Sequence, residues 1–188
     1  METLLLTGPK HSGKTSAGRM LAALSGAVFI DLDERIEKRT GKGPRTLYRE
    51  GPEVFRAAEA ETLKELLEAP AEKGSFRVIA AGGGLIDNPA ALELVKKTCP
   101  VCIVYLEVSA ETAWERIVRG TGEKGELPPF LDTPNPRETH RALHERRAAA
   151  YKKLARFVVN GECREPGERA EEIISLLAPK KSPLPPSR

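Results

Sequence analysis

The sequence contains few cysteines, few aromatic residues, little charge imbalance and no long hydrophobic run. Its three cysteines, Cys99, Cys102 and Cys163, do not make a disulfide framework, and their scarcity favours a cytoplasmic protein. Aromatic residues make up 5% of the chain, too little for a platform on which nucleic-acid bases stack. A formal net charge of +3 gives no reason to expect nucleic acid or a membrane surface as a partner.

No apolar run approaches the roughly 20 residues that cross a bilayer. The first seven residues lack the basic and long apolar regions of a secretory signal. We therefore expect no membrane partner and no signal peptide. The length of 188 residues predicts one domain, which we place at residues 1–178. The proline-rich residues 179–188 are expected to form a disordered tail.

Strand-like and helix-like segments alternate along the chain. Short apolar runs predict five strands, at Thr3–Thr7, Ala27–Asp31, Arg77–Ala81, Val101–Leu106 and Phe157–Asn160. Amphipathic or capped segments predict helices at Thr15–Leu24, Glu34–Arg39, Pro52–Leu67, Asn88–Lys97, Ser109–Arg119, Arg137–Ala155 and Pro166–Leu177. This alternation predicts an α/β sandwich with a mostly parallel sheet, whose ligands bind outside the carboxyl ends of the strands.

Residues Gly120–Pro136 interrupt this alternation. Glycines and prolines recur there, and neither a helical nor a strand period survives. A stretch of this length without structure of its own is typical of a functional lid or a disordered loop.

Residues Gly8–Thr15 fit the phosphate-loop pattern G-x-x-x-x-G-K-[ST], and they stand between a predicted strand and a predicted helix. Backbone N–H groups at such a helix start converge on phosphate oxygens. Lys14 would bring a positive charge to the β- and γ-phosphates, and the hydroxyl of Thr15 is a hard oxygen ligand suited to Mg²⁺. The alternative is a glycine turn with a lysine by chance. We predict that the chain binds a nucleoside triphosphate with magnesium.

Asp31 and Asp33 follow the second predicted strand. Residues i and i+2 of a strand point the same way, so both carboxylates are expected to face one cleft. One could hold the water shell of Mg²⁺, and the other could accept a proton from an acceptor hydroxyl. The alternative is that Asp33 only caps the helix expected from Glu34.

Gly82, Gly83 and Gly84 follow the third predicted strand, where close approach of backbone to a ligand favours glycine. The alternative is a plain end to the strand. Arginine would bind an acceptor carboxylate, because its planar fork matches one bidentately. Spacing alone does not single out Arg56 or Arg147 among the arginines of the chain.

Together these motifs resemble the shikimate kinase family. The resemblance covers residues 3–177 and rests on the phosphate loop, Phe29–Asp33 followed by Ile36–Gly41, Gly51–Arg56 with Glu59, Gly82–Gly84, Val104–Leu106, Arg147 with Tyr151, and Arg164–Gly167. It implies a three-layer α/β/α sandwich of the P-loop kinase type with five parallel strands in the order 2-3-1-4-5. It also implies a monomer that uses ATP and Mg²⁺ to phosphorylate the 3-hydroxyl of shikimate in aromatic amino acid biosynthesis.

The resemblance also assigns roles to residues. Residues 32–60 would bind the acceptor, and residues 120–136 would form the lid. ATP would be bound by His11, Ser12, Gly13, Lys14, Thr15 and Ser16, with Arg119 and Arg164 beside the nucleotide. Thr15 and, through water, Asp31 would hold the metal. Asp33 would bind the hydroxyl groups of shikimate and act as the base, and Lys14 would bind the transferring phosphate. Arg56 and Arg147 would bind the carboxylate of shikimate. The ring of shikimate would lie against Gly82, Gly83 and Gly84.

The lid departs from the family pattern. Pro128 stands where that pattern has an arginine that contacts the transferring phosphate. Lys124, Arg119 or Arg137 could supply the missing charge. Two alternatives stay open: a kinase of another small hydroxylated carboxylate and, because of Pro128, a nucleotide-binding relative with weakened catalysis.

Two weaker patterns favour structural roles. Cys99 and Cys102 have the redox spacing C-x-x-C, but they run into a predicted buried strand, which favours two plain thiols. His140 and His144 share one helix face and have no third metal ligand nearby in the sequence.

Overall fold

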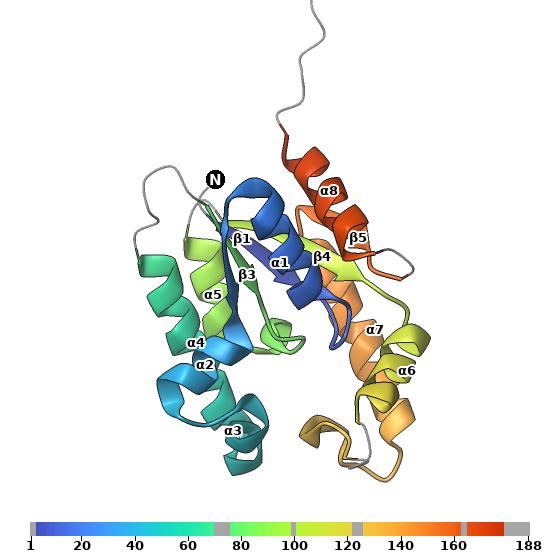
Figure 1. Ribbon diagram of the computed structural model, residues 1–188. Coiled ribbons are helices and arrows are strands. Elements are labelled where there is room, and N and C mark those ends of the chain that lie inside the picture. Colours follow the sequence, from blue (N-terminus) through green and yellow to red (C-terminus); the bar gives the residue numbers. More distant parts are fainter. Residues whose placement is uncertain (1–2, 70–75, 99–100, 122–125, 163–164, 179–188) are drawn as a thin grey trace, which may run out of the picture.

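The structure, a computed structural model, describes residues 3–69, 76–98, 101–121, 126–162 and 165–178. Five parallel strands, β1 (Thr3–Thr7), β2 (Val28–Asp31), β3 (Arg77–Ala80), β4 (Val101–Glu107) and β5 (Phe157–Asn160), form one sheet. Their order is β2-β3-β1-β4-β5, which confirms the expected topology (Figure 1). Because all strands run the same way, their carboxyl ends meet at one edge of the sheet.

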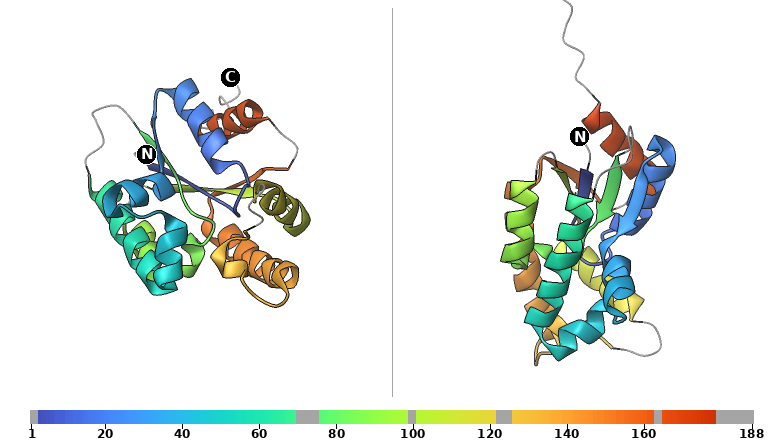
Figure 2. Two further views of the ribbon diagram at one scale, coloured as in Figure 1. Left: turned by 60° about the horizontal axis from the view of Figure 1, so that its bottom comes forward. Right: turned by 90° about the vertical axis from the view of Figure 1, so that its left-hand side faces the viewer.

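Helices cover both faces of the sheet, as the view in the left panel of Figure 2 shows. The helices α1 (Lys14–Ser25) and α8 (Pro166–Leu177) pack on one face. The helices α4 (Pro52–Glu68), α5 (Pro89–Lys97) and α7 (Pro136–Leu154) lie on the other. The short helices α2 (Leu32–Thr40) and α3 (Pro44–Glu50) extend beyond the carboxyl ends of the strands, and α6 (Ala110–Gly120) lies beside α7.

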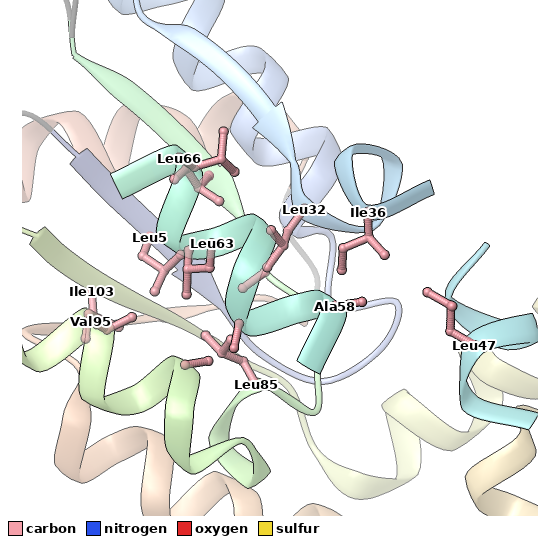
Figure 3. Close-up of a cluster of buried hydrophobic side chains, with 14 residues drawn as sticks. Leu5, Leu32, Ile36, Leu47, Ala58, Leu63, Leu66, Leu85, Val95 and Ile103 are labelled. Atoms are coloured by element: carbon pink, nitrogen blue, oxygen red, sulfur yellow. The ribbon is translucent and has the colours of Figure 1, made fainter. Parts of the chain in front are cut away.

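The central strand β1 supplies the core on both faces because successive side chains of a strand alternate. Leu4 and Leu6 pack with the cluster that includes Leu21 of α1. Leu5 points to the opposite face and joins Leu63 of α4 and residues of α5 (Figure 3). All three leucines of β1 are fully buried, and burial of each contributes roughly 1.5–3 kcal/mol of apolar transfer free energy. The core therefore fixes the strand that leads into the phosphate loop.

Most predicted elements are confirmed to within two residues at each end, and one helix was missed. The helix α3, with Pro44 at its first turn, lies between Gly43 and Gly51 and buries only Leu47. So short a helix has no apolar period of its own, and packing on α4 must stabilise it. The expected lid is also not wholly irregular, because Pro129–Leu131 form a 3₁₀ turn, η3.

No helix in the described part of the chain is long and apolar enough to cross a bilayer. The tail predicted to be disordered, residues 179–188, lies outside the described residues.

Candidate active site

A cavity of about 970 Å³ opens at the carboxyl ends of the strands, where the alternation of elements predicted a ligand site. It joins the phosphate loop, the triple glycine, the start of α2, the helix α7 and the lid. Its lining includes the predicted site residues His11, Gly13, Lys14, Thr15, Ser16, Asp31, Asp33, Gly82, Gly83, Gly84 and Arg147. Most of the predicted site is thus brought together around one space.

The phosphate loop depends on its glycines. Gly13 caps α1 with φ 90°, a left-handed conformation that glycine adopts without strain. Nζ of Lys14 donates to the carbonyl oxygens of Gly8 (3.0 Å) and Pro9 (2.7 Å). Burial lowers the pKa of Lys14 to about 8, although the charges of Asp33 and Asp31 raise it. The loop therefore encloses a desolvated cation at the start of a helix, which is an arrangement suited to phosphate.

Two arginines that the sequence analysis did not single out support this loop. Nη1 of Arg116 donates to the carbonyl oxygens of His11 and Gly161, each at 3.2 Å. Nη1 of the buried Arg169 donates to the same Gly161 oxygen at 3.2 Å. A β-carbon at Gly13 would lie 3.0 Å from the guanidinium of Arg169. Only the position of Arg169 beside buried apolar residues of α8 could have indicated that it points inward.

The expected geometry of the two aspartates is wrong. The helix α2 begins at Leu32, so Asp33 lies in its first turn and not on a strand with Asp31. Oδ1 of Asp31 accepts the backbone N–H of Asp33 at 3.0 Å, so Asp31 caps the helix and Asp33 does not. The preference of a helix start for an aspartate cap explains the difference. Both side chains nevertheless line the cavity.

Thr15 and Asp31 offer a pair of hard oxygen ligands. Oγ1 of Thr15 donates to Oδ2 of Asp31 at 2.8 Å, beside the phosphate loop. No group of three or more histidine, cysteine, aspartate or glutamate side chains suited to a metal occurs among the described residues. Mg²⁺ is commonly held by one or two protein oxygens together with phosphates and water. The donor set at Thr15 and Asp31 therefore fits Mg²⁺ bound with a nucleotide.

Two carboxylates, those of the half-buried Asp33 and the fully buried Glu59, face Gly82. A β-carbon there would lie 3.3 Å from Oε1 of Glu59 and 3.4 Å from Oδ1 of Asp33, and neither oxygen has a hydrogen-bond partner among the described residues. Burial is the main cause that raises the pKa of Asp33, and it raises the pKa of Glu59 to about 7. Nδ2 of Asn88 donates to the other oxygen of Glu59 at 2.9 Å. Buried acceptors without partners are rare, so this spot suits the hydroxyl groups of a ligand.

Gly83 packs directly on the phosphate loop. A β-carbon at Gly83 would lie 3.0 Å from the backbone nitrogen of Lys10 and 3.2 Å from the carbonyl oxygen of Gly8. Any other residue would push the loop and the strand end apart. The triple glycine is therefore more than the end of a strand, because it joins the phosphate loop to the carboxylate side of the cavity.

The remaining predicted site residues are placed differently. The side chain of Arg147 lines the cavity, whereas Arg56 is exposed and lies outside the lining. Arg119 is exposed in the last turn of α6. Ser12 is fully buried behind the loop, where its hydroxyl lies 3.4 Å from Nζ of Lys14. Arg164 lies outside the described residues.

The lid contacts the helix that the sequence analysis missed. Arg45 of α3 donates to the carbonyl oxygens of Glu126 (3.1 Å) and Leu127 (3.5 Å), and it pairs with the Glu126 carboxylate at 3.2 Å. Pro128, where the family pattern has arginine, lines the cavity without a charge. Of the cations expected to replace that arginine, Arg137 is paired with Glu111, and Lys124 lies outside the described residues.

The histidines of α7 lie at the cavity, whereas Cys102 lies in the sheet. His140 and His144 are buried, and both line the cavity. Burial, helped by the neighbouring His144, lowers the pKa of His140 to about 4, so this ring is neutral near pH 7. Cys102 is buried in β4, and Cys99 lies outside the described residues.

Comparisons with known proteins agree with this geometry. A family model described as shikimate kinase matches residues 10–178. A curated shikimate kinase from Thermus thermophilus is 38% identical over 173 residues, which cover 92% of this chain and 88% of the relative. One from a Marinomonas species is 30% identical over 175 residues, covering 93% and 91%. The solved structure of a shikimate kinase from Acinetobacter baumannii in complex with shikimate superposes with a TM-score of 0.80 at 30% identity, covering 94% of this chain and 93% of that one.

Proposed function

The chain belongs to the shikimate kinase family, and we propose that it transfers the γ-phosphoryl group of ATP to the 3-hydroxyl of shikimate. The observation that carries this proposal is one cavity in which a phosphate loop meets the carboxylates of Asp31 and Asp33 and the guanidinium of Arg147. The phosphate loop takes the donor. The carboxylates and the arginine suit an acceptor that carries both hydroxyl groups and a negative charge.

On the acceptor side of the cavity, we assign one residue as the base and two as ligands of the acceptor carboxylate. The acceptor hydroxyl would lie against Gly82, where Asp33 could accept its proton. Burial of Asp33 raises its pKa, which makes the carboxylate a stronger base than an exposed aspartate. Arg147, and by family resemblance Arg56, would bind the carboxylate of shikimate.

On the donor side of the cavity, we assign the residues that would bind ATP. The loop N–H groups and Lys14 would hold the β- and γ-phosphates, with Ser12 and Ser16 in support and Arg119 and Arg164 toward the adenosine. Mg²⁺ held by Thr15 and Asp31 would supply positive charge to the phosphate oxygens. Residues 1–178 would act as one monomeric kinase domain in the cytoplasm, with residues 32–60 as the acceptor-binding region and 120–136 as the lid.

Steady-state turnover with ATP, Mg²⁺ and shikimate tests the proposal, with the product identified by mass and by ³¹P NMR. We expect shikimate 3-phosphate. Turnover of a different hydroxylated carboxylate in place of shikimate would favour the first alternative. Nucleotide binding without turnover of any acceptor would favour the second, a relative with weakened catalysis.

Replacing Arg147 by alanine is expected to raise the KM for shikimate by at least about tenfold, because a hydrogen bond to a charged group contributes about 1.5–3 kcal/mol. Arg56→Ala should act in the same direction but less strongly, since Arg56 is exposed. The KM for ATP should stay within about twofold in both variants. If either variant weakened ATP and shikimate equally, the carboxylate clamp would be misassigned.

Replacing Arg45 by alanine is expected to lower kcat about fivefold, the effect of losing about 1 kcal/mol of hydrogen bonding when the lid is closed. Arg49→Ala is the matched control, because Arg49 pairs with the same Glu126 carboxylate at 3.1 Å but does not line the cavity. Exposed ion pairs contribute little, so kcat of this control should not change. An equal decrease of kcat in both variants would mean that only the ion pairs with the Glu126 carboxylate, and not the hydrogen bonds of Arg45 to the lid backbone, affect turnover.

A further inference from the structure

Asp87 holds the arginine that lines the acceptor side of the cavity. It ends the 3₁₀ turn η1 (Leu85–Asp87), three residues after the triple glycine. Nε of Arg147 donates to Oδ2 of Asp87 at 2.8 Å, and Nη2 forms an ion pair with the same oxygen at 2.7 Å. The side chains are 15% exposed for Asp87 and 20% for Arg147, so this pair is much less hydrated than a surface ion pair.

The geometry of this pair leaves one edge of the guanidinium for another anion. A guanidinium carries five N–H groups in a plane, and Asp87 contacts its Nε–Nη2 edge. The Nη1–Nη2 edge is the one that binds a second carboxylate end-on. Nη2 lies 3.7 Å from the position of a β-carbon at Gly84, and the guanidinium carbon lies 5.5 Å from the centre of the Phe130 ring in the lid. Both neighbours belong to the cavity lining.

Asp87 itself is firmly placed. Its backbone N–H donates to the carbonyl oxygen of Gly84 at 2.9 Å. The preceding residue, Ile86, donates its N–H to the phenol oxygen of Tyr151 at 3.1 Å, and Tyr151 is a buried residue one turn along α7 from Arg147. The turn η1 and the helix α7 are therefore joined at two points. A side chain fixed in this way can fix the orientation of its partner.

We propose that Asp87 is a positioning residue for acceptor binding, which holds Arg147 by one edge so that the other edge meets the carboxylate of the acceptor. This role rests on the proposed function. The opposite role is an internal competitor, in which the Asp87 carboxylate occupies Arg147 and must be displaced by the acceptor. The two roles predict opposite changes in acceptor affinity when Asp87 is removed.

Kinetics of the full chain with ATP and shikimate test the proposal. Asp87→Ala is expected to raise the KM for shikimate about five- to tenfold, with kcat and the KM for ATP within about twofold. Asp87→Asn, which keeps the shape and loses the charge, should fall between wild type and Asp87→Ala. Arg146→Gln is the matched control, because Arg146 also pairs with Asp87 (2.7 Å) but is 57% exposed and lies outside the cavity lining; its KM should not change.

A double-mutant cycle separates positioning from a merely structural role. In an Arg147→Ala background, the Asp87→Ala change should add nothing to the KM for shikimate. The Ki of a shikimate amide, which lacks the negative charge, should be the same in wild type and Asp87→Ala. A KM that falls, stays unchanged, or rises equally in the Arg147→Ala background would overturn the proposal.

A readout without turnover completes the test. The Arg147 Nε–H signal in ¹⁵N-resolved NMR spectra should show slow exchange with water in the wild type and fast exchange in Asp87→Ala. Fast exchange in the wild type would overturn the positioning role even in an active enzyme. A wild type that does not turn over shikimate would overturn the proposed function and the acceptor role of Asp87 together, whereas an active wild type with an unchanged Asp87→Ala variant would overturn only the latter.

Discussion

Replacing Lys14 by alanine is expected to lower kcat at least about a hundredfold, since loss of one preorganised donor to a developing anion typically costs that much or more. Lys14 is buried and lines the cavity, and its Nζ donates to the loop carbonyl oxygens of Gly8 and Pro9. Its charge meets phosphate in the Michaelis complex and more strongly as the phosphoryl group transfers. The fold should persist, because the hydrogen bonds of the ammonium are to oxygens of the phosphate loop, at Gly8, Pro9 and Ser12.

The measurement is steady-state turnover together with a thermal melt. Lys64→Ala is the control, because Lys64 is an exposed lysine of α4 that pairs with Glu68 and is far from the loop in sequence. Its kcat should equal that of the wild type. Undiminished turnover of Lys14→Ala would remove the phosphate loop from the mechanism.

The same lysine predicts a pH dependence. Burial lowers the pKa of Lys14 to about 8, so in the free enzyme the ammonium is charged below that pH and becomes neutral as the pH rises through it. The value of kcat/KM for ATP reports the free enzyme and should fall above about pH 8. Bound phosphates hold the proton on Lys14, so kcat at saturating ATP should fall only at higher pH.

The backbone of this site could be predicted because its signals are local. The strand Thr3–Thr7, the loop Gly8–Thr15 and the following helix occupy one continuous stretch, and each has its own pattern of residues. The same holds for the strand β3 and the triple glycine that follows it. A parallel sheet then brings these ends to one edge without further information from the sequence.

The pairings across the site could not be predicted, because each joins residues far apart in the chain. Arg45 meets Glu126 across 81 positions, and Arg147 meets Asp87 across 60. On their own helices these arginines look like ordinary surface charges. Their partners are set by packing of the helices, which a pattern of residues along one helix does not encode.

The aspartates show a third case, in which two local rules compete. Strand alternation and helix capping both apply to residues 31–33, and the choice depends on where the helix begins. Capping by Asp31 prevails because its carboxylate accepts the N–H groups of Asp33 and Glu34. Asp33 still reaches the cavity, but from the first turn of a helix.

Replacing Asp33 by asparagine is expected to lower kcat about 10²–10⁴-fold, the usual contribution of a general base. The amide keeps the shape of the carboxylate and can still bind a hydroxyl, but it cannot accept the proton. The KM for shikimate should therefore change much less than kcat, by about threefold or less. Rapid-quench measurement of the first turnover would place the loss in the chemical step.

Glu59→Gln is the matched control for this prediction. Its carboxylate lies at a similar distance from the position of a β-carbon at Gly82, 3.3 against 3.4 Å for Asp33. If both carboxylates only bind hydroxyl groups, the two variants should raise the KM for shikimate alike and leave kcat close to that of the wild type. If Asp33 is the base, only Asp33→Asn should lose kcat by two orders of magnitude or more. A raised KM with an unchanged kcat in Asp33→Asn would assign this residue to binding alone and leave the phosphoryl transfer to positioning and charge.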